Sequence, residues 1–302
     1  MLTSLHRNRD NTDHEFEYIV IDDGSTDSTP AVIKEFSERS PLRVVRHETP
    51  VGLASARNVG LDAARGKYLT FLDGDDWIGR DYLTQAISAI DSLGCDFVRF
   101  DHVQVRERER VLHRAPEPRR DAVLDPRAGI LPAWRRSMVD YPYAWAGIYR
   151  RDLGEILRFE DGLHTAEDRP WIWRLHQQAS SYAVVSLAGV FYRRLVANSL
   201  TQIGDERQLH FLDAFIKVLE GVADEPDLQP KAIRQFLAVL AHQIQTGSRF
   251  TFAHRRQMRS RARAILATVP PQALMEAMPV DGRSDILWPL LPAAAKRVRQ
   301  AV

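Results

Sequence analysis

The feature that most constrains the fold of this chain is an apolar segment that ends abruptly in acidic residues. Residues 68–72 have the composition of a buried strand, and the sequence Asp-Gly-Asp-Asp follows at 73–76. Residues 16–21 repeat this arrangement and lead into an acidic pair at 22–23. Ligands of an open α/β sheet bind outside the carboxyl ends of its strands. We therefore expect both acidic segments to border one crevice.

Strand and helix patterns alternate through the first hundred residues. Strands are expected at 16–21, 42–46, 68–72 and 96–100, and helices at about 30–38, 52–65 and 81–93. Such alternation predicts an α/β fold with a Rossmann-like, mixed and mostly parallel sheet flanked by helices. The charged, proline-bearing segment 106–127 is expected to be an exposed connection, and the aromatic residues between 129 and 200 to be mainly core. From residue 205 onward apolar residues recur at helical spacing, which predicts a helical C-terminal extension.

The composition excludes several classes of protein. The 302 residues include 41 Lys and Arg against 40 Asp and Glu, a balance that predicts no nucleic-acid partner. The single cysteine, Cys95, excludes an internal disulfide and fits a reducing compartment. No segment approaches the roughly 20 apolar residues of a membrane span, and the first residues lack the apolar core of a signal peptide. We expect a cytoplasmic protein that is at most peripheral at the inner face of the cell membrane.

Carboxylates two residues apart at the end of a strand suit a divalent cation. Asp73 and Asp75 would hold Mg²⁺ or Mn²⁺ against a phosphate, because these ions prefer carboxylate, water and phosphate oxygens. Two other interpretations stay open. One is a solvated turn, in which Asp and Gly are common. The other is a phosphatase of the haloacid dehalogenase type, whose local sequence is similar and in which Asp73 would be the nucleophile.

Taken together, these segments resemble the donor-binding half of the family 2 glycosyltransferases, which carry the GT-A fold. The resemblance lies in VIDDGSTDST at 20–29, in GLASARNVGLDAARGKYLTFLDGDDW at 52–77, and in the later segments 148–152, 166–168 and 191–194. It spans roughly residues 15–200. It implies a catalytic domain over 1–200, with a nucleotide-binding half to about 115 and an acceptor half from about 116, followed by a helical region over 201–302.

The resemblance also implies an activity. Members of this family move a sugar from a nucleoside diphosphate to an acceptor with inversion at the anomeric carbon. Here we expect a UDP-linked donor, and a cell-surface polysaccharide or another cell-envelope glycan, free or lipid-linked, as the acceptor. The sequence lacks the Gln-x-x-Arg-Trp motif and the membrane spans of processive members, so transfer is expected to be non-processive. The alternative outside the enzymes is a truncated, non-catalytic homologue that binds glycan.

By position, the resemblance assigns roles to individual residues. Asp22 and Asp23 correspond to the acids that contact the nucleoside, and Asp73 and Asp75 to the metal-binding pair beside the diphosphate. Asp168 corresponds to the catalytic base, a carboxylate that takes the proton from the acceptor hydroxyl as that oxygen attacks. Simple capping of the helix that begins near Asp168 is the competing interpretation.

Basic residues supply further candidates. Arg57, on the expected helix 52–65, and Arg193, in a tyrosine–arginine segment that resembles the end of the family's catalytic domain, would contact the diphosphate through their bidentate guanidinium groups. An exposed surface arginine is the alternative for each. The basic, amphipathic segment 249–263 would meet anionic lipid, a polyprenyl-diphosphate acceptor or a phosphate-bearing polymer, and a solvated helix face is its alternative.

One element of the family has no counterpart in this chain. Family members normally open with a strand that supports the nucleobase, and no such strand precedes residue 16. Residues 2–9 look like the end of the helix that would follow it. We therefore expect an unpaired sheet edge at this place and a nucleoside pocket that is open on one side.

Overall fold

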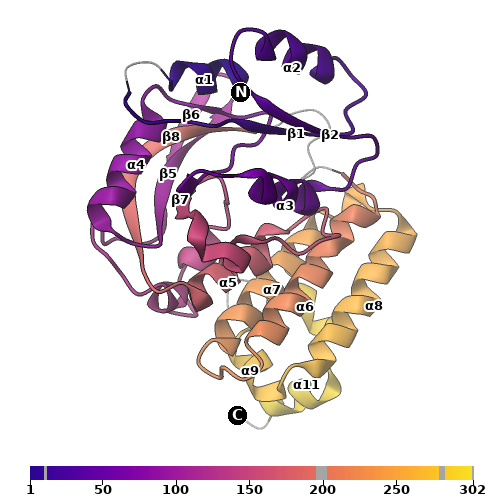
Figure 1. Cartoon of the computed structure of the whole chain (residues 1–302). Coiled ribbons are helices and arrows are strands. Elements are labelled where there is room, and N and C mark those ends of the chain that lie inside the picture. The colour runs from indigo at the N-terminus through magenta and orange to yellow at the C-terminus, as the bar shows by residue number, and fades with distance from the viewer. Residues whose placement is uncertain (10–11, 195–202, 279–282, 301–302) are drawn as a thin grey trace.

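The computed structural model shows a sheet with helices around it, joined to a bundle of helices that the C-terminal part of the chain forms (Figure 1). It describes residues 1–9, 12–194, 203–278 and 283–300. The order of its elements confirms an α/β fold with a helical C-terminal extension. Over these described ranges, no helix has both the length and the apolar character needed to cross a membrane.

The first sixty residues form a small parallel layer. Helix α1 (Leu2–Arg7) precedes β1 (Ile19–Asp23), and α2 (Thr29–Ser37) leads to β2 (Arg43–His47), which pairs with β1 in parallel. Proline in the first turn of α2 favours the start of this helix. Helix α3 (Leu53–Ala63) then packs against β1. The helix expected at the N-terminus is confirmed, although it ends at Arg7.

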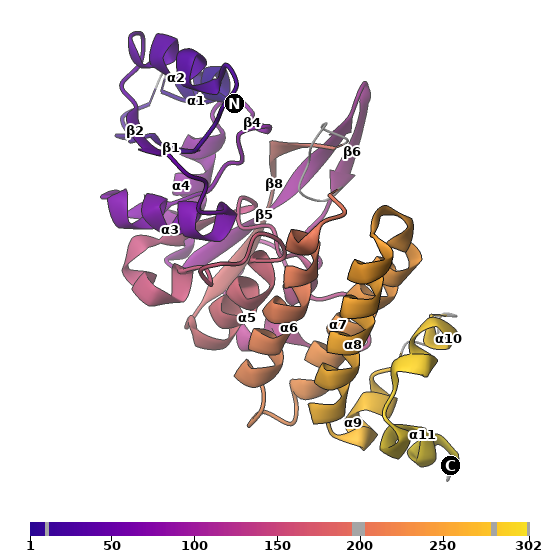
Figure 2. The same ribbon diagram turned by 90° about the vertical axis from the view of Figure 1, so that its right-hand side faces the viewer.

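A second sheet, with six strands, forms the centre of the molecule (Figure 2). Its strands are β3 (Tyr68–Leu69), β4 (Trp77–Ile78), β5 (Phe97–Arg106), β6 (Glu109–His113), β7 (Gly147–Arg150) and β8 (Tyr182–Arg193). They lie in the order β3-β7-β5-β8-β4, and β6 pairs with the second half of β5. Helix α4 (Tyr82–Leu93) packs against this sheet and ends at Gly94, whose φ of 64° is the left-handed conformation that glycine adopts readily.

The mixed character of the sheet is confirmed, but the expected predominance of parallel pairs is wrong for the strands described. Parallel pairing joins β1 to β2 and β5 to β8, whereas β3–β7, β4–β8, β5–β6 and β5–β7 are antiparallel. One cause is that β5 continues past residue 100 and folds back as a hairpin with β6. Most side chains of the segment 106–127 are exposed, as expected, but part of the segment is a strand, and Ala115 and Glu117 within it are buried.

The two sheets do not join. Among the described strands, β1 pairs with β2 alone and β3 with β7 alone, and a cavity of about 550 Å³ lies between β1 and β3. Apolar side chains line it from both sides, and they include Phe16, Tyr18, Val20, Leu61, Leu69 and Phe71. The expected unpaired sheet edge lies at this place, because among the described strands β1 pairs with β2 alone.

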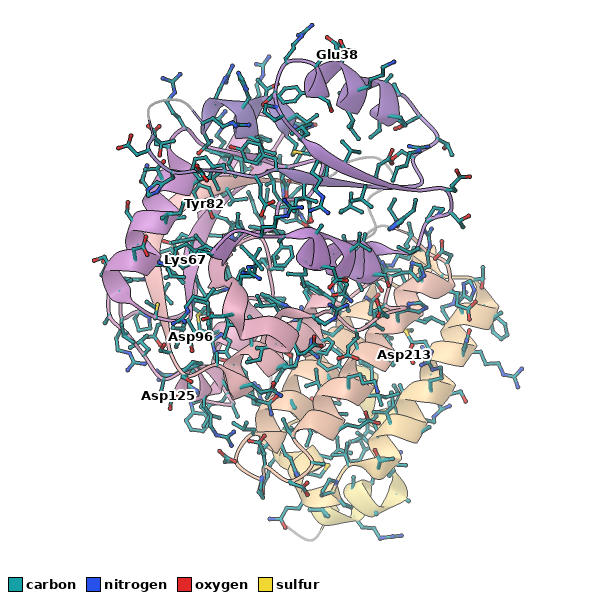
Figure 3. The ribbon with its side chains drawn as sticks, viewed as in Figure 1. Glu38, Lys67, Tyr82, Asp96, Asp125 and Asp213 are labelled. Atoms are coloured by element: carbon teal, nitrogen blue, oxygen red, sulfur yellow. The ribbon has the colours of Figure 1, made fainter. Side chains whose placement is uncertain are left out.

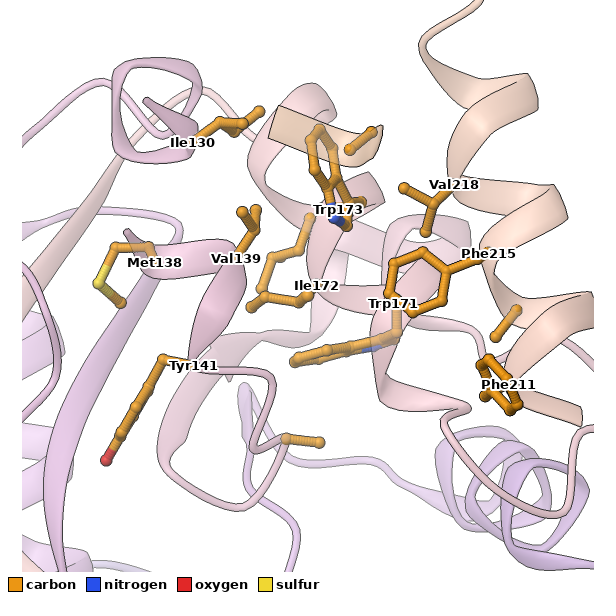
Figure 4. Close-up of a cluster of buried hydrophobic side chains, with 14 of the residues drawn as sticks. Ile130, Met138, Val139, Tyr141, Trp171, Ile172, Trp173, Phe211, Phe215 and Val218 are labelled. Atoms are coloured by element: carbon orange, nitrogen blue, oxygen red, sulfur yellow. The ribbon is translucent and has the colours of Figure 1, made fainter. Parts of the chain in front are cut away.

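The C-terminal helices form a bundle. They are α6 (His210–Gly221), α7 (Gln229–Gln245), α8 (Phe252–Thr268), α9 (Pro271–Glu276), α10 (Ser284–Leu287) and α11 (Ala293–Gln300). Of these, α6 and α7 pack against α5 (Asp168–Gln178). The apolar stripe of α6 at 211–218 faces the buried side chains 171–173 of α5 (Figure 4). One cluster of buried side chains contains residues of both the sheet and the bundle. The division into domains near residue 200 stays a prediction, since the core continues across it.

Helix α8 contains most of the basic segment 249–263. Its residues Met258, Ala262 and Leu266 are buried in the bundle. Arg261 forms an ion pair with Asp213 of α6, which is labelled in Figure 3. Because these apolar positions are covered, contact of this segment with a membrane stays a prediction that rests on its exposed side chains.

Candidate active site

A cleft of about 1360 Å³ lies between the central sheet and the helical bundle. Five of the predicted site residues line it, namely Arg57, Asp73, Asp75, Asp168 and Arg193. They come from α3, from the loop after β3, from the start of α5 and from the end of β8. The fold therefore brings together side chains that are far apart in the sequence.

Arg57 joins the acidic segment after β3 to the acidic segment at the start of α5. Its Nη2 donates to Asp73 Oδ1 at 2.9 Å, and its Nη1 donates to Glu167 Oε1 at 2.7 Å. Its side chain is 9% exposed, and its guanidinium carbon lies 5.1 Å from the centre of the Phe159 ring. The interpretation of Arg57 as an exposed surface arginine is wrong, and its contact with a diphosphate stays a prediction.

The acids after β3 differ from one another in exposure. Asp75 is exposed at the cleft, whereas Asp76 is fully buried and accepts a hydrogen bond from Arg193 N at 2.7 Å through Oδ1. Within the described residues, Asp76 Oδ2 has no hydrogen-bond partner. Burial, and then the charges of Asp73 and Asp75, raise the pKa of Asp76 to about 7. Loss of solvation and the nearby Asp73 also raise the pKa of Asp75.

Glu167 and Asp168 stand at the N-terminus of α5. Asp168 is the first residue of the helix and Glu167 precedes it, and no side-chain capping bond is found at this end among the described residues. Glu167 is buried and Asp168 is half-buried. Burial raises the pKa of both carboxyl groups, and each also lies near other acids. A carboxyl group with a raised pKa beside an open cleft suits proton transfer, and the capping interpretation finds no support in these contacts.

Asp22 and Asp23, at the end of β1, are not among the residues that line the cleft. Asp22 accepts hydrogen bonds from Ser25 N and from Arg46. Asp23 is bound by His47 and by two backbone N–H groups of the loop before α3. Burial raises the pKa of each carboxyl group, but these hydrogen bonds outweigh it and hold the pKa of both below its ordinary value. Both acids therefore stabilise the loops around β1, and their contact with a nucleoside stays a prediction.

The loop bound by Asp23 lies next to the Glu-Asp segment. Gly52 N donates to Asp23 Oδ2 at 2.9 Å, and Gly52 has a φ of 93°. A Cβ atom at this position would lie 2.7 Å from Nδ1 of His164, which lines the cleft. Glycine is required here by both its conformation and its neighbour. Asp23 therefore affects the cleft only indirectly, because it holds Gly52 close to His164.

The predicted metal site consists of Asp73 and Asp75. Over the described ranges, no group of three or more His, Cys, Asp or Glu side chains is arranged to hold a metal ion. Mg²⁺ is usually held by one or two carboxylates together with substrate phosphates, so it does not need such a group. The carboxylates of Asp73 and Asp75 fit this set of ligands, and Arg57 leaves one Asp73 oxygen free of its hydrogen bond. A bound Mn²⁺ or Mg²⁺ stays a prediction.

The remainder of the cleft was not found by sequence reasoning. Helix α7 contributes Lys231, Arg234, Gln235 and His242, which recur at helical spacing along one face. A hydrogen bond and an ion pair hold this face in place. Trp173 Nε1 of α5 donates to Gln235 Oε1 at 2.9 Å, and Lys231 pairs with Asp140. Glu167, which lines the cleft, and the buried Asp76 lie in segments that the sequence singled out, but neither residue was assigned a role. The polar repeat of α7 was a usable signal, but a solvated helix face has the same pattern.

Comparison with known proteins shows what the chain is similar to. The sequence profile described as Glycosyl transferase family 2 matches residues 1–157. The chain is 29% identical over 196 residues to the uncharacterized glycosyltransferase EpsJ of Bacillus subtilis (strain 168), covering 63% of this chain and 55% of EpsJ. It is 28% identical over 283 residues to the succinoglycan biosynthesis protein ExoO of Rhizobium meliloti (strain 1021), covering 88% of this chain and 77% of ExoO.

A solved structure extends the comparison to the whole chain. TarS residues 1–349 of S. aureus, in complex with UDP-GlcNAc, is similar with a TM-score of 0.71 and 20% identity, covering 100% of this chain and 87% of that one. This likeness confirms the fold. The chain spans about half the length of EpsJ (55%), so EpsJ extends well beyond the matched region.

Proposed function

Because the chain belongs to glycosyl transferase family 2, we propose that it transfers a sugar from a UDP-linked donor to a hydroxyl group of a cell-envelope glycan. The transfer inverts the configuration at the anomeric carbon and is non-processive. The observation that carries this proposal is that Arg57, Asp73, Asp75 and Asp168 line a single cleft. An acid pair, a bidentate cation and a separate carboxylate with a raised pKa are the groups that such a transfer requires.

The names of related proteins support the choice of donor and acceptor. ExoO is named for succinoglycan biosynthesis. TarS is named as a poly(ribitol-phosphate) β-N-acetylglucosaminyltransferase, and one of its solved structures is a complex with UDP-GlcNAc. For this chain we therefore propose a UDP-sugar donor and an acceptor that belongs to a cell-envelope polysaccharide.

In the proposed reaction Asp168 acts as the general base. Its carboxylate accepts the proton of the acceptor hydroxyl while that oxygen attacks the anomeric carbon from the face opposite the leaving diphosphate. Burial of the neighbouring Glu167 and its ion pair with Arg57 hold the start of α5 against α3. The base therefore stands on a fixed helix end, which favours a reproducible attack geometry.

The diphosphate leaves from the side of the cleft that carries Asp73 and Asp75. These two carboxylates would hold Mn²⁺ or Mg²⁺, which when bound supplies positive charge to the leaving diphosphate. Arg57 and Arg193 both line the cleft near this pair and would bind phosphate oxygens directly. Arg193 also lies with its guanidinium carbon 5.2 Å from the centre of the Trp77 ring, which restrains its position.

The experiment that tests the proposal is a donor panel. The protein is mixed with UDP- and GDP-linked sugars in the presence of Mn²⁺, and its thermal stability and the slow hydrolysis of each donor are measured. We expect metal-dependent stabilisation by one UDP-sugar and release of UDP. The Asp224→Asn variant is the matched control, because Asp224 is exposed and lies outside the cleft.

Two results would contradict the proposal. Release of phosphate from simple monoesters, without any preference for a nucleotide-sugar, would identify a phosphatase that uses Asp73. No stabilisation and no hydrolysis with any donor would identify a homologue that binds glycan without turnover.

A further inference from the structure

The cleft is far more basic than the chain as a whole. Ten Arg and Lys side chains line it against five Asp and Glu side chains, whereas the whole chain has 41 against 40. Two of the ten are engaged by acids of the cleft, since Arg57 pairs with Asp73 and Glu167, and Lys231 pairs with Asp140. The cleft therefore has an excess of positive charge. The residues that we assign to donor binding do not account for this excess.

Part of this excess lies on the loop that precedes Ser137. Arg135 and Arg136 are exposed there, and both line the cleft. No hydrogen bond or ion pair of either guanidinium group is found in the part of the chain that the structure describes. The loop itself is held in place, because Lys231 Nζ donates to Arg135 O at 2.7 Å and Ser137 Oγ donates to Ile130 O at 2.7 Å. Two cations are thus presented to the cleft from an anchored backbone.

An aromatic side chain stands directly beside them. Trp134 also lines the cleft and is 71% exposed, whereas Trp145, Trp171 and Trp173 are buried as expected for core residues. Exposure of so large an apolar surface is unfavourable in the free protein, and it is compensated when a ligand covers it. A flat indole beside two consecutive arginines suits a sugar ring that carries anionic groups.

Helix α7 contacts this loop and lines the same cleft. Arg234 lies one helical turn after Lys231, which contacts the loop, and it lines the same cleft without a hydrogen bond or ion pair from any described residue. Its side chain is half-buried, so a ligand that it binds would lie against the wall of the cleft. The acids at Asp73, Asp75 and Asp168 would repel an anionic chain, and the basic residues offset this repulsion away from the donor.

We propose that Trp134, Arg135, Arg136 and Arg234 form the acceptor subsite and that the acceptor is an anionic glycan. The indole stacks on a sugar ring, and the guanidinium groups bind phosphate or carboxylate groups on the neighbouring units. This inference rests on the proposed glycosyltransferase function, and it specifies the chemical class of the acceptor. Two sources of the charge share this chemistry, namely phosphodiester links between units and uronic acid units.

The test measures binding of three six-unit oligosaccharide or polymer chains to the 302-residue protein in the presence of UDP and Mn²⁺. The chains are a ribitol-phosphate oligomer, an oligogalacturonate and a neutral maltooligosaccharide. Isothermal titration calorimetry at low and high salt gives the affinity and its dependence on charge. We expect one anionic chain to bind at least about tenfold more tightly than the neutral chain at low salt, and this preference to fall as salt screens the charges. Which anionic chain binds more tightly identifies the source of the charge.

Variants locate the subsite. The double variant Arg135→Gln with Arg136→Gln is expected to lose most of the preference for the anionic chain and most of its salt dependence. Trp134→Ala is expected to weaken binding while the salt dependence remains. The matched controls are Arg108→Gln and Val32→Ala, which change an exposed arginine and a 53% exposed apolar residue outside both the cleft and the basic segment 249–263. Stabilisation by the UDP-sugar serves as the check that every variant is folded.

Three outcomes decide the inference. Loss of the anionic preference in the double variant but not in the Arg108 control supports it. Equal binding of neutral and anionic chains, or an unchanged preference in the double variant, overturns it even when the donor is bound and hydrolysed. If no donor is bound or hydrolysed, the proposed function itself fails, so the two failures are distinguishable.

Discussion

The two acid-rich strand ends resemble each other in sequence, yet they differ in what their charges do. At the end of β1, hydrogen bonds from Ser25, Arg46, His47 and the loop before α3 hold the pKa of both carboxyl groups below its ordinary value. At the end of β3, burial and mutual repulsion raise the pKa of Asp75 and Asp76. The first pair is satisfied by the protein, whereas the second retains negative charge that the protein compensates only in part.

This difference distinguishes acids that stabilise the protein from acids that are available to a ligand. A carboxylate whose hydrogen bonds are already made has little to gain from a ligand, while one that is close to like charges gains from a cation. Glu167 and Asp168 belong with the second pair, since their pKa values are raised as well. The cleft therefore concentrates the groups that a metal ion, a diphosphate or a proton would stabilise. Four measurements test whether the comparison holds.

The largest effect is expected for Asp168→Asn. The amide cannot accept the proton of the acceptor, so transfer should fall by roughly 10²–10⁴-fold, the usual worth of a positioned general base. Donor binding should be unchanged, because Asp168 does not hold the diphosphate. Initial rates of sugar transfer, with donor affinity measured in parallel, check this. Near-normal turnover by the folded variant would show that Asp168 is not the base and that, like Asp22 and Asp23, it has a structural role.

A smaller but still large effect is expected for Asp75→Ala. Removal of one of the two proposed metal ligands should weaken nucleotide binding in the presence of Mn²⁺ by about tenfold or more, since the diphosphate would face the remaining carboxylates. Calorimetry with UDP, with and without Mn²⁺, measures this. The Asp224→Asn control should bind as the unmodified protein does, and unchanged affinity of Asp75→Ala would remove the metal assignment.

The two strand ends should also respond to pH in opposite directions. Asp76 has a pKa of about 7 in the folded chain, against 3.8 ordinarily, so its contribution to stability is full below about pH 4 and is lost as pH rises toward 7. Asp22 and Asp23 have lowered pKa values in the folded chain. Their contribution to stability is therefore present above about pH 4 and is lost as the pH falls through these lowered pKa values. Melting temperatures measured from pH 3 to 8 should therefore pass through a maximum.

Replacement of Asp76 distinguishes the two limbs of that curve. Asp76→Asn should reduce the decline between about pH 4 and pH 7, because the residue no longer titrates, and should leave the acid limb in place. The remaining decline is expected from Glu167, whose pKa is also raised to about 7. A decline that persists unchanged in this variant would assign the titration to another buried group.

The smallest effect is expected for Asp23→Asn. Val51 N and Gly52 N each donate to a different carboxylate oxygen, and the amide nitrogen that replaces one of these oxygens cannot accept, so one hydrogen bond is lost and the free energy of unfolding should fall by about 1–3 kcal/mol. Urea denaturation measures this change. Unchanged stability together with much weaker nucleotide binding would show that Asp23 belongs with the ligand-binding acids, and would break the comparison.

The sequence was informative where function depends on local order and uninformative where it depends on distant packing. Strand ends, helix starts and the positions of Asp73, Asp75 and Asp168 follow from short segments. The contact of Arg57 with Glu167 joins residues that only the folded sheet brings together. Antiparallel pairing of β3 with β7 has no local signal, because a two-residue strand gives no periodicity.

The packing of α6 and α7 against α5 has a consequence for synthesis of the chain. The helix that begins at Asp168 carries Trp171 and Trp173, which are buried in the finished protein partly through contacts with these later helices. While the ribosome is adding residues 180–245, that aromatic surface has no cover and is open to association with other chains. The helix that carries Asp168 therefore reaches its final packing only after α7 has emerged from the ribosome. We expect the nascent chain to bind chaperones before that point.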